Sequence, residues 1–304
     1  MKTCIIIVTY NAMAWIDKCL TSSYEQGLPT DVFVVDNGST DGTQDYIKTN
    51  FPEAFFFQSG INLGFGKANN LGFEYALKNG YDYVYLLNQD AWLEKDTIQQ
   101  LVAIQKRYPK YGILSPVQMT KDFKFIDRNL TKSLGGDDCP HLISDLYNNT
   151  LKDVYSIKFV MAAHWLISCD CLKIIGGFAP IFPHYGEDDN YIQRALFFNY
   201  QVGICPHLKV VHDRGDRVDC IDKIIHLSYT SKFLKTACDI NNNAFFSLLK
   251  AYTFLFKDFF IFLFRERRML KPLINVFKGV FSLFLILKSR CFSKRKQTPF
   301  LFHN

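Results

Sequence analysis

Short apolar runs of strand length alternate with longer helical patterns through the first 120 residues, and this alternation constrains the fold more than any other feature. The expected strands are 4–8, 32–35, 54–58 and 83–87, and the expected helices between them are 14–24, 43–50 and 66–79. Runs that are apolar at every position indicate strands covered on both faces, as in parallel sheets built from βαβ units. The pattern predicts an α/β fold with a mostly parallel sheet flanked by helices.

The second half of the chain is less regular. Residues 120–160 are polar and contain Gly135-Gly136-Asp137-Asp138, which is typical of a loop-rich ligand-binding region and equally of a plain insertion. An apolar run at 160–167 is followed by a loop to Gly186, a helix expected at 187–199, and two strands expected at 200–205 and 208–211. We expect one domain over 1–240, composed of two halves at 1–120 and 121–240.

The segment 241–304 differs in composition and is expected to form a separate helical extension. Its aromatic-rich helical stretches are 245–264 and 273–287, and residues 245–304 hold 12 Lys and Arg against 2 Asp and Glu, a net charge of +10. The chain's net charge of +6 therefore leaves −4 on residues 1–244. The longest uncharged stretch there, 279–287, is far below the roughly 20 residues that span a bilayer.

Apolar aromatic helix faces with interspersed Lys and Arg favour a helical tail lying in a membrane interface, where cations meet anionic lipid. The alternative is a helical cap packed on the protein's own core or on a second subunit of a homodimer. We expect deletion of 245–304 to release the protein from membranes while leaving the binding site in 1–120 intact.

Other classes of protein fit the sequence poorly. The nine cysteines lack paired CxxC spacing, which disfavours a zinc site, and they sit singly in apolar runs, which disfavours a disulfide framework. The apolar run at 4–8 is too short for a signal peptide, so we expect a cytoplasmic protein. Nucleic-acid binding is not expected, because the basic residues lie among Phe and Leu in the tail while the first 244 residues are net acidic.

Polar residues follow the expected strands, where ligands bind on open parallel sheets. Each cluster alone also suits an ordinary turn, so the order and spacing of the four clusters matter more than any one of them. They are 7–11 (IVTYN), 34–42 (VVDNGSTDG), 62–70 (NLGFGKANN) and 86–90 (LLNQD).

Together these four motifs closely resemble the family-2 inverting glycosyltransferases of the GT-A fold. The resemblance continues through Gly176-Gly177-Phe178, 185–189 (YGEDD) and His212, and so covers about residues 1–215. It is strongest to the bacterial rhamnosyltransferase and galactofuranosyltransferase branches, which build cell-surface polysaccharides. The tail after Asn243 carries no matching motif.

The resemblance implies a nucleotide-diphosphate sugar as donor, with the donor half at 1–120 and the acceptor half, which includes the loop-rich region 120–160, at 121–240. Asp36 would contact the base or ribose, and the glycines and N-terminus of the helix after the third strand would approach the diphosphate. For Lys67 the alternative is a solvated surface lysine. The expected donor-binding residues are Thr9, Tyr10, Asn11, Asp36, Asn62, Gly64, Lys67, Asn88 and Gln89.

The segment Asn88-Gln89-Asp90 occupies the place of the family's Asp-x-Asp motif, which holds Mg²⁺ or Mn²⁺ through carboxylate oxygens. Asn88 replaces the first acid, which leaves Asp90 as the expected metal ligand of the three. His212, at a strand end, corresponds to a position where some relatives supply an imidazole to the same ion. The alternative for His212 is a structural histidine.

By position in the resembling motif, Asp188 is the expected catalytic base and Glu187 the residue that orients the acceptor. Acidic residues in a first helical turn also stabilise the helix without any catalysis. Trp165, with its neighbour His164, could stack on the acceptor sugar or belong to the core.

The sequence thus predicts a metal-dependent inverting glycosyltransferase acting on a saccharide or lipid-linked saccharide at the inner face of the cytoplasmic membrane. The alternative is a catalytically silent nucleotide-sugar-binding or scaffold protein, which the substitution at Asn88 keeps open.

Overall fold

The computed structural model describes residues 1–215, 220–267 and 269–302. Its strands are β1 (Thr3–Thr9), β2 (Thr30–Asp36), β3 (Phe55–Gln58), β4 (Tyr83–Asn88), β5 (Ala91–Trp92), β6 (Tyr111–Met119), β7 (Tyr155–Ser156), β8 (His164–Ser168) and β9 (Gln201–His212). The helices that flank them are α1 (Ile16–Tyr24), α2 (Thr43–Asn50), α3 (Phe65–Lys78), α4 (Thr97–Arg107), α5 (Arg128–Thr131), α6 (Leu142–Tyr147), α7 (Cys169–Ile175) and α8 (Glu187–Phe197).

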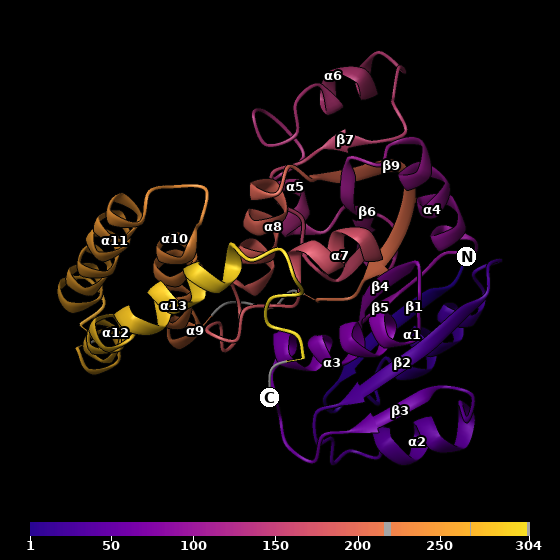
Figure 1. The fold of residues 1–304 in the computed structure, drawn as a ribbon, viewed down its shortest axis with the longest axis horizontal. Helices are drawn as coiled ribbons and strands as arrows, with labels where there is room; N and C mark the ends of the chain where they lie inside the picture. Colours follow the sequence, from indigo (N-terminus) through magenta and orange to yellow (C-terminus); the bar gives the residue numbers. More distant parts are fainter. Residues whose placement is uncertain (216–219, 268, 303–304) are drawn as a thin grey trace.

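The strands of the described residues form one sheet in the order β3-β2-β1-β4-β8-β6-β9-β5, with β7 paired to β9 (Figure 1). β1 pairs in parallel with both β2 and β4, and β6 pairs in parallel with β9. β8 runs antiparallel to its neighbours β4 and β6, so β6 and β9 point in the same direction as β1, β2 and β4. The predicted mostly parallel α/β fold is confirmed.

Two apolar cores lie on opposite faces of this sheet. In β1, Cys4 and Ile6 face a core shared with α3, α7 and α8, whereas Ile5 and Ile7 face a core shared with α1, α2 and α4. Successive side chains of a strand point to opposite faces, so a run that is apolar at every position is what a doubly covered strand requires. The apolar runs predicted as strands therefore occupy the centre of the molecule.

The C-terminal end of the sheet differs from the prediction in one respect. The segments 200–205 and 208–211 form one strand, β9, and its pairing with β6 shifts register between Cys205 and Lys209. Pro206 has no N–H for the ladder, which interrupts the sequence pattern, but the strand continues beyond a bulge at this point. Helices α4 and α7 and strand β6 were not individually predicted.

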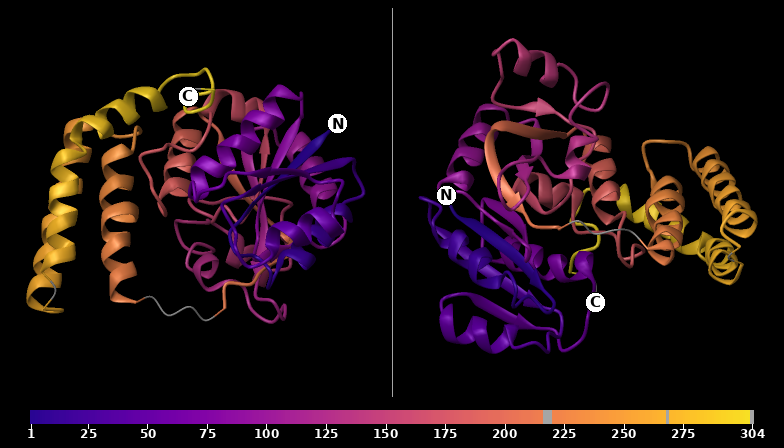
Figure 2. Two further views of the ribbon diagram at one scale, coloured as in Figure 1. Left: turned by 90° about the horizontal axis from the view of Figure 1, so that it is seen from below. Right: turned by 180° about the vertical axis from the view of Figure 1, so that it is seen from behind.

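The helices after β9 form a lobe beside the sheet (Figures 1 and 2). They are α9 (Ile221–Leu227), the π-helix η1 (Ser228–Leu234), α10 (Lys235–Cys238), α11 (Ala244–Phe264), α12 (Leu270–Phe281) and α13 (Leu283–Ser293). A third core joins η1, α10, α11 and α13 to Ala179 and Phe182 of the loop before α8. The lobe thus includes α9, η1 and α10, which precede the predicted boundary at residue 240.

The predicted helix 273–287 is wrong as a single helix, because α12 and α13 meet at Ser282 with a bend of 57°. Ser282 Oγ donates to the carbonyl of Gly279 at 3.0 Å, a side-chain bond that competes with the helical ladder. Within the described ranges no single helix is long and apolar enough to cross a membrane. The bent pair α12–α13, taken as one segment, has the length and the apolar composition that a membrane span requires.

The last described residues return to the sheet domain. Leu301 is fully buried in the core with α3, α7 and α8, and the carbonyl of Pro299 accepts from Gly177 N–H at 2.9 Å. A Cβ on Gly176 would lie 2.0 Å from that Pro299 oxygen, so this close approach requires glycine. Deletion of 245–304 would therefore remove Leu301 from this core, and the expectation that it leaves the donor site in 1–120 intact stays a prediction.

Candidate functional site

The sequence-predicted residues gather at one rim of the sheet. Parallel strands end at the same edge, and β1, β2, β4 and β9 end there at Thr9, Asp36, Asn88 and His212. A short turn joins the end of α8 to the start of β9, so α8 begins at the rim where β9 finishes. Asp36, Asp90, Asp188 and His212 consequently lie along a single edge of the molecule.

Asp36 is fully buried and organises the loop that follows β2. Its Oδ1 accepts from the N–H groups of Gly38 and Ser39 at 3.0 and 2.9 Å and from Gln44 Nε2 at 2.7 Å. Its Oδ2 accepts from Thr9 Oγ1 at 2.9 Å and from Ser39 Oγ at 2.5 Å. The carboxylate already has five donors from this chain, so a contact with a nucleotide would require an exchange of donors.

Three other predicted donor residues hold the neighbouring loops together. Gln89 Oε1 accepts from the N–H of Tyr10 at 2.7 Å, and Gln89 Nε2 donates to the Tyr10 carbonyl at 3.2 Å. Asn11 has a positive φ of 52°, and its Oδ1 accepts from the N–H of Thr40 at 2.9 Å. These amides position the loops after β1 and β4, while the ring of Tyr10 is half exposed.

Helix α3 begins beside the loop that leads into α8. Asn62 Oδ1 accepts from Gly64 N–H at 2.9 Å, and Gly64 has a φ of 77°, which favours glycine. A hollow of about 330 Å³ lies here, lined by Asn62, Gly64 and Lys67 on one side and by Pro183 on the other. Lys67 is exposed in the first turn of α3. The start of α3 therefore faces the acceptor half across a hollow.

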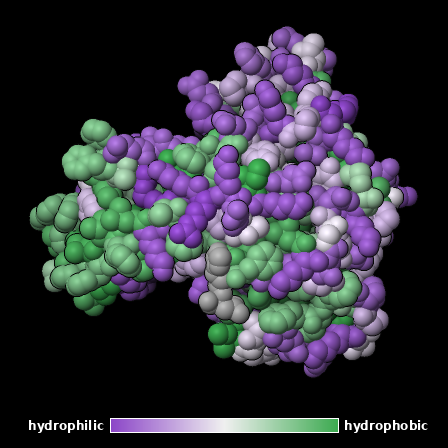
Figure 3. All heavy atoms as spheres, in the orientation of Figure 1, coloured by the Kyte–Doolittle hydropathy of each residue, from purple (hydrophilic) through white to green (hydrophobic). Residues whose placement is uncertain are grey.

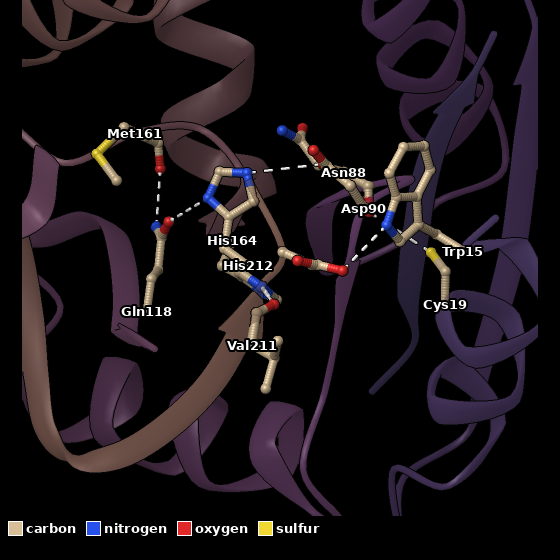
Figure 4. A network of polar contacts seen from close by, with 10 residues as sticks. Trp15, Cys19, Asn88, Asp90, Gln118, Met161, His164, Val211 and His212 are labelled. Carbon is tan, nitrogen blue, oxygen red and sulfur yellow. Dashed lines mark hydrogen bonds and ion pairs between the residues drawn. The ribbon is translucent and has the colours of Figure 1, made fainter. Parts of the chain in front are cut away.

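Asp90 and His212 form a pair whose orientation is set by a third residue, Gln118 (Figure 4). Gln118 Nε2 donates to the carbonyl of Met161 at 3.1 Å, which turns Gln118 Oε1 toward His212 Nδ1 at 3.1 Å. Since an amide oxygen is an acceptor, Nδ1 carries the proton in the neutral imidazole. The Nε2 lone pair then faces Asp90 Oδ1 at 3.6 Å, an arrangement of two acceptors that suits a cation.

The side chains of Asp90 and His212 provide only part of the coordination shell of a divalent metal. A carboxylate oxygen and a neutral imidazole nitrogen are both ligands for Mn²⁺, and carboxylate is preferred by Mg²⁺. In the ranges that the structure describes, no group of three or more His, Cys, Asp or Glu converges on one position. Among the described residues at this rim, Asp90 and His212 are the two side chains that could hold a metal together.

Residues around Asp90 fix its backbone. The N–H of Asp213 donates to the carbonyl of Asp90 at 2.7 Å, and Asp213 Oδ2 accepts from Trp15 Nε1 at 3.2 Å. Asn88 donates its N–H to Ala163 at 3.1 Å, and its carbonyl accepts from the Cys19 thiol at 3.5 Å (Figure 4). The turn after β4 is therefore held from α1, β8 and β9, and Asp90 sits at its centre.

The first turn of α8 carries three adjacent carboxylates. Burial, with a contribution from Asp189, raises the pKa of Asp188 to about 7, and burial, with a contribution from Asp188, raises the pKa of Glu187 to about 8. Lys235 on α10 pairs with Asp189 at 3.1 Å. Glu187 packs beside the start of α3, since a Cβ on Gly66 would lie 4.0 Å from Glu187 Cβ. A carboxyl group with a pKa near neutrality suits proton transfer.

The predicted acceptor role of His164 and Trp165 is wrong for this structure, because both side chains are fully buried in the sheet. His164 Nε2 contacts the carbonyl of Val211 and Nδ1 contacts Tyr85 Oη, both at 2.9 Å, and burial lowers its pKa to about 3. Trp165 packs against Phe178 in the core with α3 and α8. Strand β8 lies between β4 and β6, where no sugar reaches its side chains.

Sequence reasoning missed two residues of the site, Gln118 and Lys235. Gln118 is a fully buried polar residue near the end of a mostly apolar strand, and a glutamine in such a run is a detectable signal. Lys235 is one of many lysines, and its contact with Asp189 joins positions 46 residues apart. No sequence pattern could have singled it out.

The chain is similar to several rhamnosyltransferases. It is 32% identical over 123 residues to N-acetylglucosaminyl-diphospho-decaprenol L-rhamnosyltransferase of Mycobacterium tuberculosis, a match that covers 37% of this chain and 40% of that protein. It is 24% identical over 223 residues to dTDP-rhamnosyl transferase RfbF of Shigella flexneri, which covers 70% of this chain and 69% of that protein. The chain thus matches less than half the length of the mycobacterial relative.

Two solved structures share the fold over nearly the whole chain. S. aureus TarS 1–349 in complex with UDP has a TM-score of 0.58 at 17% identity and covers 97% of this chain and 88% of that one. Mannosyltransferase PcManGT from Pyrobaculum calidifontis, in complex with GDP-Man and Mn²⁺, has a TM-score of 0.56 at 18% identity and covers 96% and 83%. These likenesses confirm the predicted GT-A-like fold with C-terminal helices.

The family itself is shown by the sequence. The model described as glycosyl transferase family 2 matches residues 4–173, which is more than half of the chain and includes every strand from β1 to β8. With the rim geometry and the rhamnosyltransferase relatives in agreement, the chain belongs to glycosyl transferase family 2.

Proposed function

We propose that this protein is an inverting glycosyltransferase that moves a sugar from a nucleotide-diphosphate sugar to a saccharide or lipid-linked saccharide during cell-surface polysaccharide synthesis. The observation that carries this proposal is the shared rim. A carboxyl group with a raised pKa, Asp188, stands at the same edge of the sheet as the metal-compatible pair Asp90 and His212. Family membership and the named activities of the relatives support it.

The donor would lie across the ends of β1, β2 and β4. Asp36 is placed to receive a base N–H or ribose hydroxyl by exchanging one of its present donors, and the loops fixed by Asn11 and Gln89 would flank the nucleoside. The start of α3, with Lys67 in its first turn, presents backbone N–H groups and a cation to the diphosphate. The hollow beside Asn62 and Gly64 connects this place to the loop before α8.

Asp90 and His212 would hold Mg²⁺ or Mn²⁺ against the diphosphate oxygens. The bound ion would neutralise the charge that develops on the departing nucleoside diphosphate. Gln118 keeps His212 in the tautomer that leaves Nε2 able to bind a cation. Asn88, in place of a carboxylate, makes this site less negative than one with two acids, so we expect weak binding of the ion when no donor is bound.

In the transfer step, the acceptor oxygen forms a bond to the anomeric carbon on the face opposite the diphosphate. The bond from that carbon to the diphosphate oxygen breaks with its electron pair, and the nucleoside diphosphate leaves. Ionised Asp188 takes the proton from the acceptor hydroxyl as that oxygen attacks. Glu187, whose raised pKa favours the protonated form at neutral pH, would donate a hydrogen bond that orients the acceptor.

The decisive experiment replaces Asp188 by Asn. A positioned general base contributes roughly 10²–10⁴-fold, so we expect transfer to fall by at least about 100-fold while the affinity for the nucleotide stays unchanged. Asp170→Asn is the matched control, because Asp170 is also an acid in the first turn of a helix, α7, but this helix begins at the edge of the sheet opposite to the rim.

Transfer and donor hydrolysis both distinguish the proposal from a silent nucleotide-sugar binder. A panel of nucleotide sugars incubated with the wild-type protein and Mn²⁺ should yield free nucleoside diphosphate with one of them. Retained turnover in Asp188→Asn would remove this residue from its proposed role. Binding of a nucleotide sugar without hydrolysis or transfer under any condition would favour the silent binder.

A further inference from the structure

Helices α11–α13 have their apolar side chains on the outside. About half of the large apolar side chains that the described residues expose lie between residues 245 and 287. Figure 3 shows hydrophobic residues gathered on this lobe, at the left of the view, whereas much of the remaining face is hydrophilic. The exposed large apolar residues of α11, α12 and α13, here called the apolar face, are Phe245, Phe246, Leu249, Phe256, Phe260, Ile261, Phe264, Leu270, Ile274, Phe277, Val280, Phe281, Leu283, Phe284, Leu285 and Leu287.

Two polar side chains of the same helices, Asp258 and Asn275, point inward. Asp258 is buried and accepts from Ser228 Oγ at 2.6 Å and from Lys232 Nζ at 3.0 Å, and Asn275 Nδ2 donates to the Ile225 carbonyl at 2.8 Å. In a helix that faces water, this arrangement would be reversed. Small and polar residues between helices, with apolar residues outside, are typical of helices in contact with lipid.

Arg290 is the clearest case of a polar side chain that is buried inside the lobe. Its guanidinium is buried and donates to the carbonyls of Ala237, Asp239 and Asn242 at 2.8, 2.5 and 2.7 Å. These three bonds close the loop between α10 and α11, so the lobe keeps its shape without burying the apolar face. The face is therefore a stable surface of this fold.

The charged residues around the apolar face indicate which kind of surface it binds. Exposed cations among the described residues 245–302 are Lys250, Lys257, Arg265, Arg267, Lys271, Lys278, Lys288, Lys294, Arg295 and Lys296, and Glu266 is the exposed acid in the same range. Of these cations, Lys271 pairs with the exposed Asp222 of α9. Basic residues interspersed with aromatic ones match a bilayer surface with anionic headgroups, because the rings enter the acyl boundary while the cations meet the phosphates.

We infer that the apolar face of α11–α13 docks in the interface of an anionic lipid bilayer. The lobe is joined to the candidate base by short contacts, since Lys235 pairs with Asp189 at 3.1 Å and His226 Nε2 contacts the carbonyl of His184 at 3.1 Å. Docking would therefore hold the rim of the sheet at a fixed position relative to the membrane. If the proposed function holds, this favours an acceptor carried on a lipid.

The test uses the full chain and vesicles. Flotation with vesicles of phosphatidylcholine and phosphatidylglycerol should carry the wild-type protein, and vesicles of phosphatidylcholine alone should carry much less. A triple variant, Phe277→Glu, Phe281→Glu and Phe284→Glu, should partition at least about tenfold less, because each change places a carboxylate where an exposed ring would enter the bilayer. Raised salt should weaken binding of the wild type.

The matched control is Ile143→Glu, Leu146→Glu and Tyr147→Glu, a triple change of exposed apolar residues on α6, outside the lobe. It should bind vesicles like the wild type. Circular dichroism and nucleotide affinity report folding and donor binding in solution, so they separate a failure of docking from a failure of the proposed function.

Equal flotation of both triple variants, or no flotation of the wild type on anionic vesicles, would overturn the inference. So would a wild-type dimer that the α12–α13 variant converts to monomer in light scattering without any change in vesicle binding. That outcome would assign the apolar face to a second copy of the chain.

Discussion

The pH dependence of transfer should follow the ionisation of Asp188. Burial, with a contribution from the Asp189 carboxylate, raises the pKa of Asp188 to about 7, and a base must be ionised to accept a proton. The ionised fraction is then about 10% at pH 6 and about 90% at pH 8, so kcat/KM should rise roughly tenfold across this window. Activity is gained, not lost, as pH rises, because the deprotonated form is the active one.

Two charged neighbours of Asp188 shift its pKa in opposite directions, so replacing each of them tests this prediction. Asp189→Asn removes a negative charge that raises the pKa of Asp188, so the midpoint of the profile should move to lower pH. Lys235→Met removes a positive charge that lowers the pKa of Asp188, so the midpoint should move to higher pH. Each pKa unit corresponds to about 1.4 kcal/mol of differential interaction, and we expect shifts of roughly half a unit to one unit.

The assay is the initial rate of nucleoside diphosphate release with excess acceptor, measured from about pH 5.5 to about pH 9. Asp170→Asn again serves as the control, and its profile should match that of the wild type. A profile that falls with rising pH, or two variants whose midpoints move in the same direction, would refute the assignment of Asp188 as the titrating base.

Two further predictions concern the metal pair and the chain end. Gln118→Leu should weaken Mn²⁺ affinity by roughly 10–100-fold, because the hydrogen-bond partner of a ligating histidine fixes the tautomer of that histidine. Calorimetric titration measures the Mn²⁺ affinity, and nitrogen NMR reports the tautomer of His212. An unchanged affinity together with an unchanged tautomer would contradict the prediction. Leu301→Ala should lower the free energy of unfolding by roughly 2–4 kcal/mol, since Leu301 is fully buried, whereas the exposed neighbour change Phe302→Ala should cost well under 1 kcal/mol. Equal melting temperatures for these two variants would show that the chain end does not hold the core.

The elements with a strong local pattern were predictable. The helix expected at 43–50 is α2 with the same bounds, and the strands at 4–8, 32–35 and 83–87 each lie within an observed strand. Apolar runs and helical periods depend on neighbouring residues alone, which is why the sequence reports them well. The continuity of β9 through Pro206 and the bend at Ser282 were missed because a bulge and a side-chain bond override the local pattern.

The roles of Trp165 and Asp36 could not be settled by pattern. A tryptophan is compatible with a sugar platform and with a core, and the position of β8 between β4 and β6 decided for the core. Asp36 was expected to face a nucleotide, and the structure surrounds it with five donors of its own chain. Whether a side chain is exposed depends on which strands become its neighbours.

The sequence by itself determined the class of sheet, the positions of its first strands and the family, because these follow from local periodicity and from motifs in register. The tertiary structure alone decided that Gln118 orients His212, that Lys235 meets Asp189, and that the chain end fills the core under α3. Each of these contacts joins residues far apart in the chain, and their energies depend on burial that exists only after folding. The apolar face of α11–α13 is the same case, since the helical pattern was visible in the sequence but only packing showed which side of each helix is left outside.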